Sequence, residues 1–329
     1  MKKVIISILI LIIFYILFSK NIPNFTFENC NYEHLKSKEL FSLSLNNSFE
    51  VFNPSIIKKE NSFIIASRCS TLSLKNIFSW IYGNLNFETF IVFIVLKDNK
   101  LKKIIYPQCK GSKLKGKFED PRLIEYKNNY YISATQFIDK NNIFPILLKF
   151  SKNFDFLKHI EYNKKDYFQK NKYSIQKNWC PFIHNENFLS HTDSFPSWKV
   201  YQINEKNGNM KNIINYDTSL FFEKYNKLHV RCSTSWKIFD ENYYICGLHT
   251  KTKQKFFPRI RSLLILINRI NLFPEKKTKL LCLDENVHSK IQYLSGIETD
   301  EDNIYLSYGI NDSKLVIKKI KKKDLIFIS

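Results

Sequence analysis

The sequence predicts an all-β fold: a five-bladed β-propeller preceded by an N-terminal transmembrane signal anchor. A strand–turn–strand unit recurs five times along the chain, at intervals of about 60 residues, which is the length of one four-stranded blade. An apolar run occupies the first residues of the chain. No segment rich in proline, glycine or serine divides the remainder, so one large domain is favoured over two.

The N-terminal segment is typical of a membrane-targeting signal. Lys2 and Lys3 precede an apolar run over residues 4–18, and Lys20 follows it. No small-residue cleavage pattern comes next, so an uncleaved anchor is favoured over a cleaved signal peptide. The excess of lysine before the run predicts an exported body, in the secretory pathway or at the cell surface. We assign residues 1–20 to the cytoplasmic tip and anchor, 21–44 to a stem and 45–329 to the propeller.

The five repeated units share one pattern. Each has a short apolar strand, a polar turn that carries asparagine, and a strand of aromatic or β-branched residues. The apolar runs at 90–96, 146–150, 263–267 and 315–320 supply further strands between the units. A strand near Leu43–Val51 is expected to close the ring beside the last blade. A β-sandwich with coincidental turn spacing is the alternative. The turn residues are Asn61, Asn129, Asn187, Asn242 and Asn303.

Composition restricts the classes of partner. The chain has 329 residues, 44% of them hydrophobic and 16% aromatic, which is typical of a globular protein. The formal net charge of +21 comes mostly from scattered lysines, and no zinc finger, helix-turn-helix or aromatic RNA platform accompanies it. We therefore expect no nucleic-acid partner. The seven cysteines show no CxxC spacing, so we expect no metal site, while one or two disulfides remain an open alternative.

Residues that flank the repeated strand pairs are predicted to face the central channel, which is the default ligand site of a propeller. Arginine is rare in this chain, and three of the few arginines fall at such positions. The predicted set combines carboxylates, guanidinium groups and aromatic rings, which suit the hydroxyls and apolar faces of sugars. Its members are Asn53, Arg68, Glu119, Asp120, Arg122, Lys177, Asn178, Trp179, His191, Arg231, His249, Glu298, Tyr308 and Asp312.

The run Phe118-Glu119-Asp120-Pro121-Arg122 resembles the signature of glycoside hydrolase family 130, which comprises β-mannoside phosphorylases and hydrolases. Four further motifs resemble the family in order and spacing, so that the resemblance spans most of the chain after residue 50. The resemblance implies a five-bladed propeller, in agreement with the repeat. Related propeller enzymes with the same signature act as β-mannosyltransferases. The further motifs are Asn53-Pro54 with Arg68, residues 177–182, Gly247-Leu248-His249, and residues 307–312.

The resemblance also implies roles for single residues. Asp120 would be the general acid of an inverting reaction and would pass its proton through a substrate hydroxyl. Such an acid must hold a proton near neutral pH, so we expect burial beside Glu119 to raise the pKa of Asp120. Arg68 and Arg122 would bind hydroxyls or phosphate oxygens. His249 and Tyr308 would complete the pocket, and Asp312 would hold a hydroxyl of the reacting sugar. For Asp120 a simple turn role, and for Trp179 and His249 a packing role, are the alternatives.

The sequence departs from the family in the fourth unit, where residues 231–236 replace a glycine-rich stretch. This weakens the case for a phosphate pocket. We therefore expect inverting transfer of a β-linked glycosyl group, mannosyl by resemblance, to a glycan acceptor or to phosphate. Hydrolysis of a β-mannoside and non-catalytic glycan binding are the alternatives. Fructosidases and arabinanases are disfavoured, because Asn53-Pro54 stands where they need an acidic residue. No cofactor is expected beyond phosphate or a sugar phosphate as co-substrate.

Overall fold

The computed structural model describes nine segments of the chain. Within the described segments no helix combines the length and the apolar character needed to cross a membrane. The predicted anchor and the first part of the predicted stem lie outside the described residues. The segments cover residues 33–44, 50–70, 89–107, 117–137, 143–162, 177–225, 228–251, 259–284 and 291–329.

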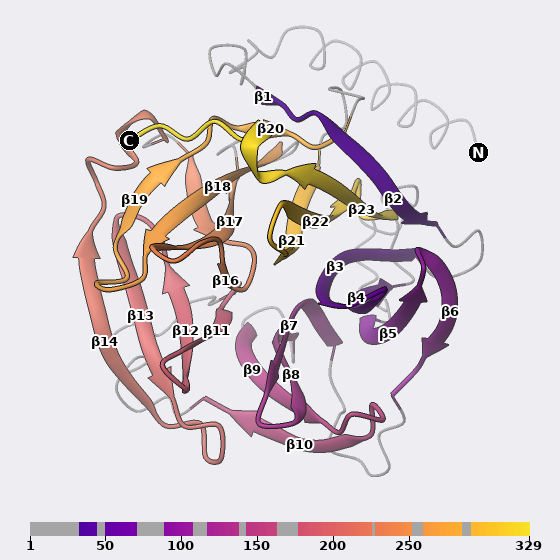
Figure 1. Cartoon of the computed structure of the whole chain (residues 1–329). Helices are drawn as coiled ribbons and strands as arrows, with labels where there is room; N and C mark the ends of the chain where they lie inside the picture. The colour runs from indigo at the N-terminus through magenta and orange to yellow at the C-terminus, as the bar shows by residue number, and fades with distance from the viewer. Residues whose placement is uncertain are drawn as a thin grey trace, which may run out of the picture.

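Five sheets, antiparallel except where β1 pairs with β20, are arranged around a central axis, which confirms the predicted five-bladed propeller (Figure 1). The strands run outward from the axis in chain order within each of the first three blades. Blade 1 holds β3 (Glu50–Lys59), β4 (Ser62–Ser70), β5 (Thr89–Lys97) and β6 (Lys100–Ile105). Blade 2 holds β7 (Lys117–Tyr126), β8 (Asn129–Phe137), β9 (Ile143–Phe150) and β10 (Phe156–Glu161). Blade 3 holds β11 (Cys180–His184), β12 (Asn187–Asp193), β13 (Ser197–Ile203) and β14 (Met210–Asp217).

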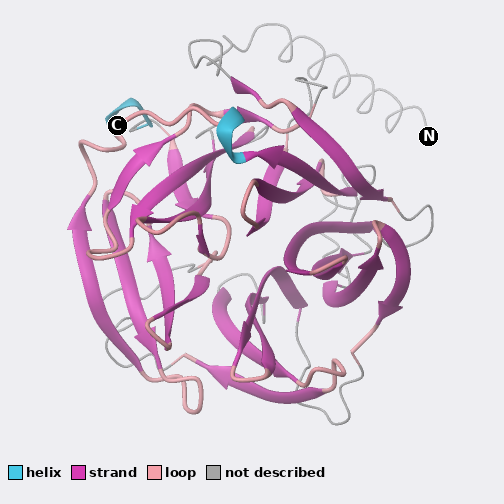
Figure 2. Ribbon diagram, viewed as in Figure 1, coloured by secondary structure: helices cyan, strands magenta, loops and turns pink. Residues whose placement is uncertain are grey.

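The last two blades recruit strands from the start of the chain. The described part contains only short helical pieces beside these strands, η3 (Glu223–Tyr225) and η4 (Lys322–Asp324) (Figure 2). Blade 4 holds β15 (His229–Cys232), β16 (Lys237–Ile238), β17 (Tyr243–Lys251), β18 (Ile260–Asn268), β19 (Pro274–Lys277), β20 (Leu281–Cys282) and β1 (Glu33–His34). Blade 5 holds β21 (Gln292–Thr299), β22 (Asn303–Ile310), β23 (Lys314–Lys321) and β2 (Ser37–Leu43).

An N-terminal strand closes the ring. Strand β2 pairs antiparallel with β23, from Ser37 opposite Ile320 to Leu43 opposite Leu315. The closing strand is therefore earlier in the chain than the predicted Leu43–Val51, because Glu50 and Val51 already belong to the inner strand of blade 1. Strands β1 and β2 both lie within the segment 21–44 that the sequence assigned to a stem. Strand β2 is the outer strand of blade 5, so this sheet joins segments from both ends of the described chain.

The hydrophobic core is divided among the blade interfaces rather than placed on the axis. Five buried clusters are present in the described part, one between each pair of neighbouring blades. Between blades 3 and 4, for example, Phe182 stacks on Trp236 with ring centroids 3.8 Å apart. Strands covered on both faces read as continuous apolar runs, such as residues 263–267 of β18, all of which are buried. The axis is thus left to the inner strands and their polar residues.

Two inner strands carry a bulge at the predicted motif. The register of β3 shifts between Phe52 and Ser55, and that of β7 shifts between Glu119 and Arg122. Asn53 and Asp120 lie within these bulges with φ of 51° and 50°. A left-handed backbone is costly for a residue other than glycine and is concentrated at functional sites. The bulges turn Asn53 and Asp120 toward each other from neighbouring blades.

Candidate active site

The first residues of the inner strands converge at one end of the propeller. Asn53 comes from β3, and Glu119, Asp120 and Arg122 come from β7. Asn178 lies two residues before the start of β11 and also has a left-handed backbone, with φ of 66°. Each of these inner strands precedes its asparagine turn by a similar interval, so the propeller fold places equivalent positions of successive blades around the same opening.

Asp120 is held as a carboxylate. Its Oδ1 accepts a hydrogen bond of 2.8 Å from the Asn53 amide, and its side chain is partly exposed at the opening. Burial alone would raise the pKa of Asp120, but the guanidinium groups of Arg122 and Arg68, the Asn53 amide and the Lys177 ammonium lower it. The expectation that burial beside Glu119 would raise this pKa is therefore wrong in direction.

Arg122 is fully buried, and both terminal nitrogens of its guanidinium donate hydrogen bonds within the protein. Its guanidinium donates to the carbonyl oxygens of Asp120 at 2.8 Å and Pro121 at 3.1 Å, and also to the hydroxyl of Tyr293. These bonds hold the bulge of β7 in place. Arg122 therefore holds the backbone of Asp120, in place of the predicted contact with substrate.

Tyr293 of β21 connects three blades and was not among the predicted site residues. Its hydroxyl donates to Asn178 Oδ1 at 2.9 Å and accepts from Arg122. Its ring lies against His249 with centroids 4.8 Å apart and an angle of 62°. A signal was present in the sequence, since Tyr293 precedes the turn residue of blade 5 by the interval that separates Glu119 from its own turn in blade 2.

Glu119 forms the charged wall beside Asp120. Its carboxylate pairs with Arg68 at 2.7 Å and with Lys177 at 3.0 Å. Arg68 is fixed in turn by a 3.0 Å hydrogen bond from its Nε to Thr89 Oγ1, and its guanidinium lies 5.0 Å from the Phe52 ring centroid. Arg68 and Lys177 therefore lie near Asp120 while their ion pairs are made with Glu119.

Asp312 approaches the same site from the turn between β22 and β23. The turn is anchored by reciprocal bonds, from Asn311 N to Ile291 O at 3.0 Å and from Ile291 N to Asn311 Oδ1 at 3.2 Å. Burial raises the pKa of Asp312 to about 6; the charge of Arg68 lowers it, and those of Asp120 and Glu119 add to the rise. Asp312 thus holds a proton more readily than Asp120 does.

Blade 4 contributes a neutral histidine and two cations. His249 is buried and its Nδ1 lies 3.1 Å from Ser233 Oγ. Burial, together with the charges of Arg231 and Arg122, lowers the pKa of His249 to about 3, so the ring is uncharged at neutral pH. Arg231 is exposed on β15, and its charge adds to desolvation in lowering the pKa of Lys251 at the end of β17. The structure thus brings His249 into the site and leaves Arg231 at its rim.

Two predicted aromatic site residues belong to the core instead. Trp179 is buried between blades 2 and 3, with its ring 4.8 Å from that of Tyr162. His191 is fully buried, and its ring centroid lies 3.9 Å from that of Trp198. The assignment of Trp179 and His191 to substrate binding is wrong, because interface packing takes both side chains away from the axis. Burial lowers the pKa of His191 to about 3.

Tyr308 and Glu298 also lie away from the cluster. Tyr308 belongs to the second strand of blade 5 and donates to the Leu283 carbonyl oxygen at 2.7 Å. Glu298 pairs with Lys237 at 2.5 Å near the far end of β21. Five residues separate Glu298 from Tyr293 along an extended strand, which is a distance of about 16 Å. Both assignments to the substrate site are corrected for these reasons.

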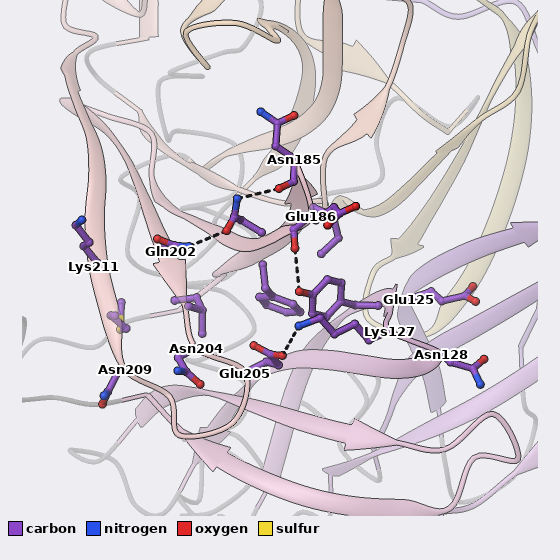
Figure 3. Close-up of a pocket in the computed structure, with 16 residues that line it drawn as sticks. Glu125, Lys127, Asn128, Asn185, Glu186, Gln202, Asn204, Glu205, Asn209 and Lys211 are labelled. Carbon is purple, nitrogen blue, oxygen red and sulfur yellow. Dashed lines mark hydrogen bonds and ion pairs between the residues drawn. The ribbon is translucent and has the colours of Figure 1, made fainter.

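A surface groove lies elsewhere, between blades 2 and 3. This groove has a volume of about 1060 Å³ and is lined by the hairpin turns of β7–β8 and β11–β12 and by the turn between β13 and β14. Figure 3 shows Lys127 bonded to Glu205, and Gln202 and Asn185 on the opposite wall. Glu125, at the groove, and Asp120 lie near opposite ends of β7. The side chains that line the groove are mostly amides and charged groups in the turns.

The described residues contain neither a candidate metal site nor a disulfide. No group of three or more histidine, cysteine or acidic side chains there could hold a metal ion. The described cysteines are all free and buried, namely Cys69, Cys180, Cys232, Cys246 and Cys282. Cys30 and Cys109 lie outside the described residues, so the predicted disulfides stay a prediction.

Solved structures with the same fold act on carbohydrates. No protein-family profile matches the chain, and the search of curated proteins found no relative. A glycosyl hydrolase from Bacteroides ovatus superposes with a TM-score of 0.59 at 13% identity, covering 85% of this chain and 86% of that one. A structure from work on the GH130 family of mannoside phosphorylases, which contains hydrolases of β-1,2 mannosidic linkages in Candida mannan, has a TM-score of 0.64 at 12% identity, covering 89% and 96%.

A third similar structure is β-1,2-mannobiose phosphorylase from Listeria innocua in complex with β-1,2-mannobiose. Its TM-score is 0.55 at 12% identity, covering 86% of this chain and 93% of that one. At such identities the likeness concerns the fold. The chain therefore has the five-bladed propeller fold that GH130 mannoside phosphorylases and other propeller glycosidases share, as the motifs around Asp120 predicted.

Proposed function

We propose that the protein is a carbohydrate-active enzyme that transfers a β-linked glycosyl group, mannosyl by resemblance, with inversion at the anomeric carbon. One observation carries the proposal. Three carboxyl groups, those of Glu119, Asp120 and Asp312, meet at one end of the channel beside Arg68 and Lys177. Inverting transfer at an anomeric centre needs one carboxyl that donates a proton and one that accepts a proton. The propeller glycosidases and phosphorylases of the same fold support the substrate class.

Asp120 is the catalytic carboxylate of this proposal. Because neighbouring cations and the Asn53 amide keep it ionised, Asp120 is suited to take a proton from the attacking hydroxyl or to stabilise positive charge on the sugar ring. Arg68 and Lys177, which Glu119 holds at the opening, are placed to contact sugar hydroxyls or phosphate oxygens. The attacking group is a glycan hydroxyl in our proposal. Phosphate or water in its place would make the enzyme a phosphorylase or a hydrolase.

We also infer that the enzyme is anchored in a membrane by residues 4–18, with the propeller exported. The apolar run between Lys3 and Lys20 supports this part of the proposal. Fractionation of cells that express the full chain tests it. Sedimentation with membranes, resistant to alkaline carbonate washing, is expected, and recovery in the supernatant contradicts the anchor.

The test of the enzymatic proposal compares the full chain with Asp120→Asn and with the matched variant Asp302→Asn. Asp302 is an exposed aspartate in the hairpin turn between β21 and β22 of blade 5, away from the cluster. Each protein is incubated with β-1,2-mannobiose, mannose 1-phosphate or a nucleotide-linked mannose and with mannoside acceptors, and products are separated by chromatography. We expect product from the unchanged chain and from D302N, and a loss of about 10²- to 10⁴-fold in D120N. Absence of product with every donor, or full activity in D120N, contradicts the proposal.

A further inference from the structure

The three carboxyl groups of the candidate site differ in their partners. Glu119 is balanced by Arg68 and Lys177 through two ion pairs. Asp120 accepts the Asn53 amide and lies in the field of two guanidinium groups. Asp312 makes no hydrogen bond and no ion pair with any residue that the structure describes. Carboxylates that share a site cannot all stay ionised unless each is compensated, so the uncompensated group takes up the proton.

The backbone holds Asp312 close to Asp120. Strand β22 lies directly against β3, and a Cβ added at Gly309 would fall 2.9 Å from the backbone nitrogen of Asn53 and closer still to its Oδ1. Asn53 is the residue that bonds Asp120. The turn that carries Asp312 follows Gly309 and has a left-handed backbone at Asp312 itself, with φ of 50°. The two aspartates therefore come from blades 2 and 5, which lie on either side of blade 1 and its Asn53.

We propose that Asp312 donates the proton to the leaving-group oxygen, while the carboxylate of Asp120 accepts the proton of the attacking hydroxyl. This assignment rests on the proposed function and deepens it. Pairs of carboxyl groups whose surroundings separate their protonation states mark the acid and the base of a site. The roles are thereby divided between two blades instead of being combined in Asp120.

The electrostatic surroundings agree with this division. The charged groups that act on Asp312 are Arg68, Asp120 and Glu119. Burial and the two carboxylates outweigh Arg68, so the pKa of Asp312 rises to about 6. An acid with this pKa is protonated below about pH 6 and loses its proton above it. The activity of the free enzyme is therefore expected to fall as pH rises through about 6.

The proposed step balances in protons and bonds. The bond between the anomeric carbon and the leaving oxygen breaks as that oxygen receives the proton of Asp312. The attacking oxygen forms its bond to the anomeric carbon from the opposite face and gives its proton to Asp120. Asp312 ends ionised and Asp120 ends protonated, and exchange with solvent restores both. No oxidant, reductant or further reactant is required.

Dependence on the leaving group tests the role of Asp312. Wild-type protein, Asp312→Asn and the control Asp302→Asn are compared on β-1,2-mannobiose and on 2,4-dinitrophenyl β-mannoside. The dinitrophenolate departs without a proton, so it needs no acid. For D312N we expect a loss of about 10²- to 10⁴-fold in kcat/KM on mannobiose, with kcat/KM on the activated mannoside little changed. Retained activity on the activated substrate also shows that the variant is folded.

A second readout separates failure of this inference from failure of the proposed function. Infrared difference spectra of the full chain follow protonated carboxyl groups whether or not turnover occurs. We expect one carboxyl that titrates near pH 6 in the wild type and in D302N and is missing from D312N. An active wild type with equal losses on both substrates in D312N, or with an unchanged infrared titration, overturns the role of Asp312 alone. A wild type inactive on every substrate overturns the proposed function and the catalytic role with it.

Discussion

The two ends of the inner strands show the same backbone feature in different chemical settings. At the groove, Lys127 and Asn128 have φ of 44° and 57°, and Asn185 and Glu186 have φ of 46° and 61°. These pairs form two-residue hairpin turns, which require a left-handed backbone. At the candidate site, Asp120 has the same conformation inside a strand, where no turn is made. The hairpin turns explain the left-handed backbone at the groove. They do not explain it at Asp120, which lies inside β7.

The charges at the two ends differ in the same way. Glu125 near the groove pairs with Lys59 and Lys152, and all three side chains are at least partly exposed. Near Asp120, Arg122 is fully buried and Glu119 is nearly so. Burial strengthens electrostatic interactions and makes an unpaired charge costly. Buried charged side chains that come together from several blades therefore identify the candidate site in this propeller.

The largest contrast is expected between the arginine beneath Asp120 and an ion pair near the groove. Arg122→Met removes the cation that lowers the pKa of Asp120 most and the hydrogen bonds that hold the bulge of β7. We expect a loss of about 3–5 kcal/mol in the free energy of unfolding, measured by urea denaturation at neutral pH. Glu125→Gln removes only exposed pairs, and its cost is expected to be about 0–1 kcal/mol. Equal losses in the two variants would erase the distinction.

Buried histidines make stability depend on pH near the core and the site. The pKa values of His191 and His249 are lowered to about 3 in the folded protein, against an unfolded value of about 6.5. The unfolded chain therefore binds more protons between these values, and stability falls as pH drops below about 6.5. Near pH 5 each histidine contributes a loss of about 2 kcal/mol. Asp312 opposes this trend, since its raised pKa makes the folded protein take up a proton.

His191→Gln is expected to reduce the difference in unfolding free energy between pH 7 and pH 5 by about 2 kcal/mol. His184, which lies beside the groove and is partly exposed, provides the matched control. His184→Gln should change the pH dependence less. A larger effect in H184Q than in H191Q would show that the core does not hold its histidine neutral. Urea titrations at both pH values provide the measurement.

Two glycines separate damage to the fold from damage to the site. Alanine at Gly309 would collide with Asn53, while alanine at Gly208 would collide with the Glu161 carbonyl near the groove and carry φ of +76°. We expect both variants to lose about 1–3 kcal/mol of stability. Only Gly309→Ala should also lower kcat/KM, because Asn53 holds Asp120. Equal activity in the two variants would show that Asn53 does not position the carboxylate.

The smallest effect is expected from an exposed pair at the groove. Lys127 and Glu205 lie 3.0 Å apart, with Lys127 largely in solvent. Lys127→Met should leave both the urea midpoint and the activity unchanged, because solvent screens the pair. Lower activity in this variant would instead give the groove a part in turnover.

The sequence allowed the blade count to be predicted because its signals are local. Two-residue turns with asparagine and alternating apolar strands depend on neighbours along the chain, and these recurred five times. The site was predicted less completely. Asn53, Arg68, Glu119, Asp120, Asn178, His249 and Asp312 do meet, whereas Trp179 and His191 turn into the interfaces. In the sequence, a polar or aromatic residue near a strand end looks the same whether its side chain faces the site or packs between blades.

Tyr293 shows the limit most plainly. It links Arg122 and Asn178 across the axis, yet its own neighbours in the sequence are Gln292 and Leu294 and carry no catalytic motif. Its role exists only once the propeller places blade 5 across the axis from Arg122 and Asn178.

By itself the sequence determined that the chain forms five β units and that a Glu-Asp-Pro-Arg motif begins the inner strand of the second. The tertiary structure alone decided which carboxyl keeps its proton. Asp120 and Asp312 are the same residue type with the same intrinsic acidity. Their pKa values move apart because Arg122, Arg68 and the Asn53 amide outweigh burial at Asp120, whereas burial and the neighbouring carboxylates outweigh Arg68 at Asp312.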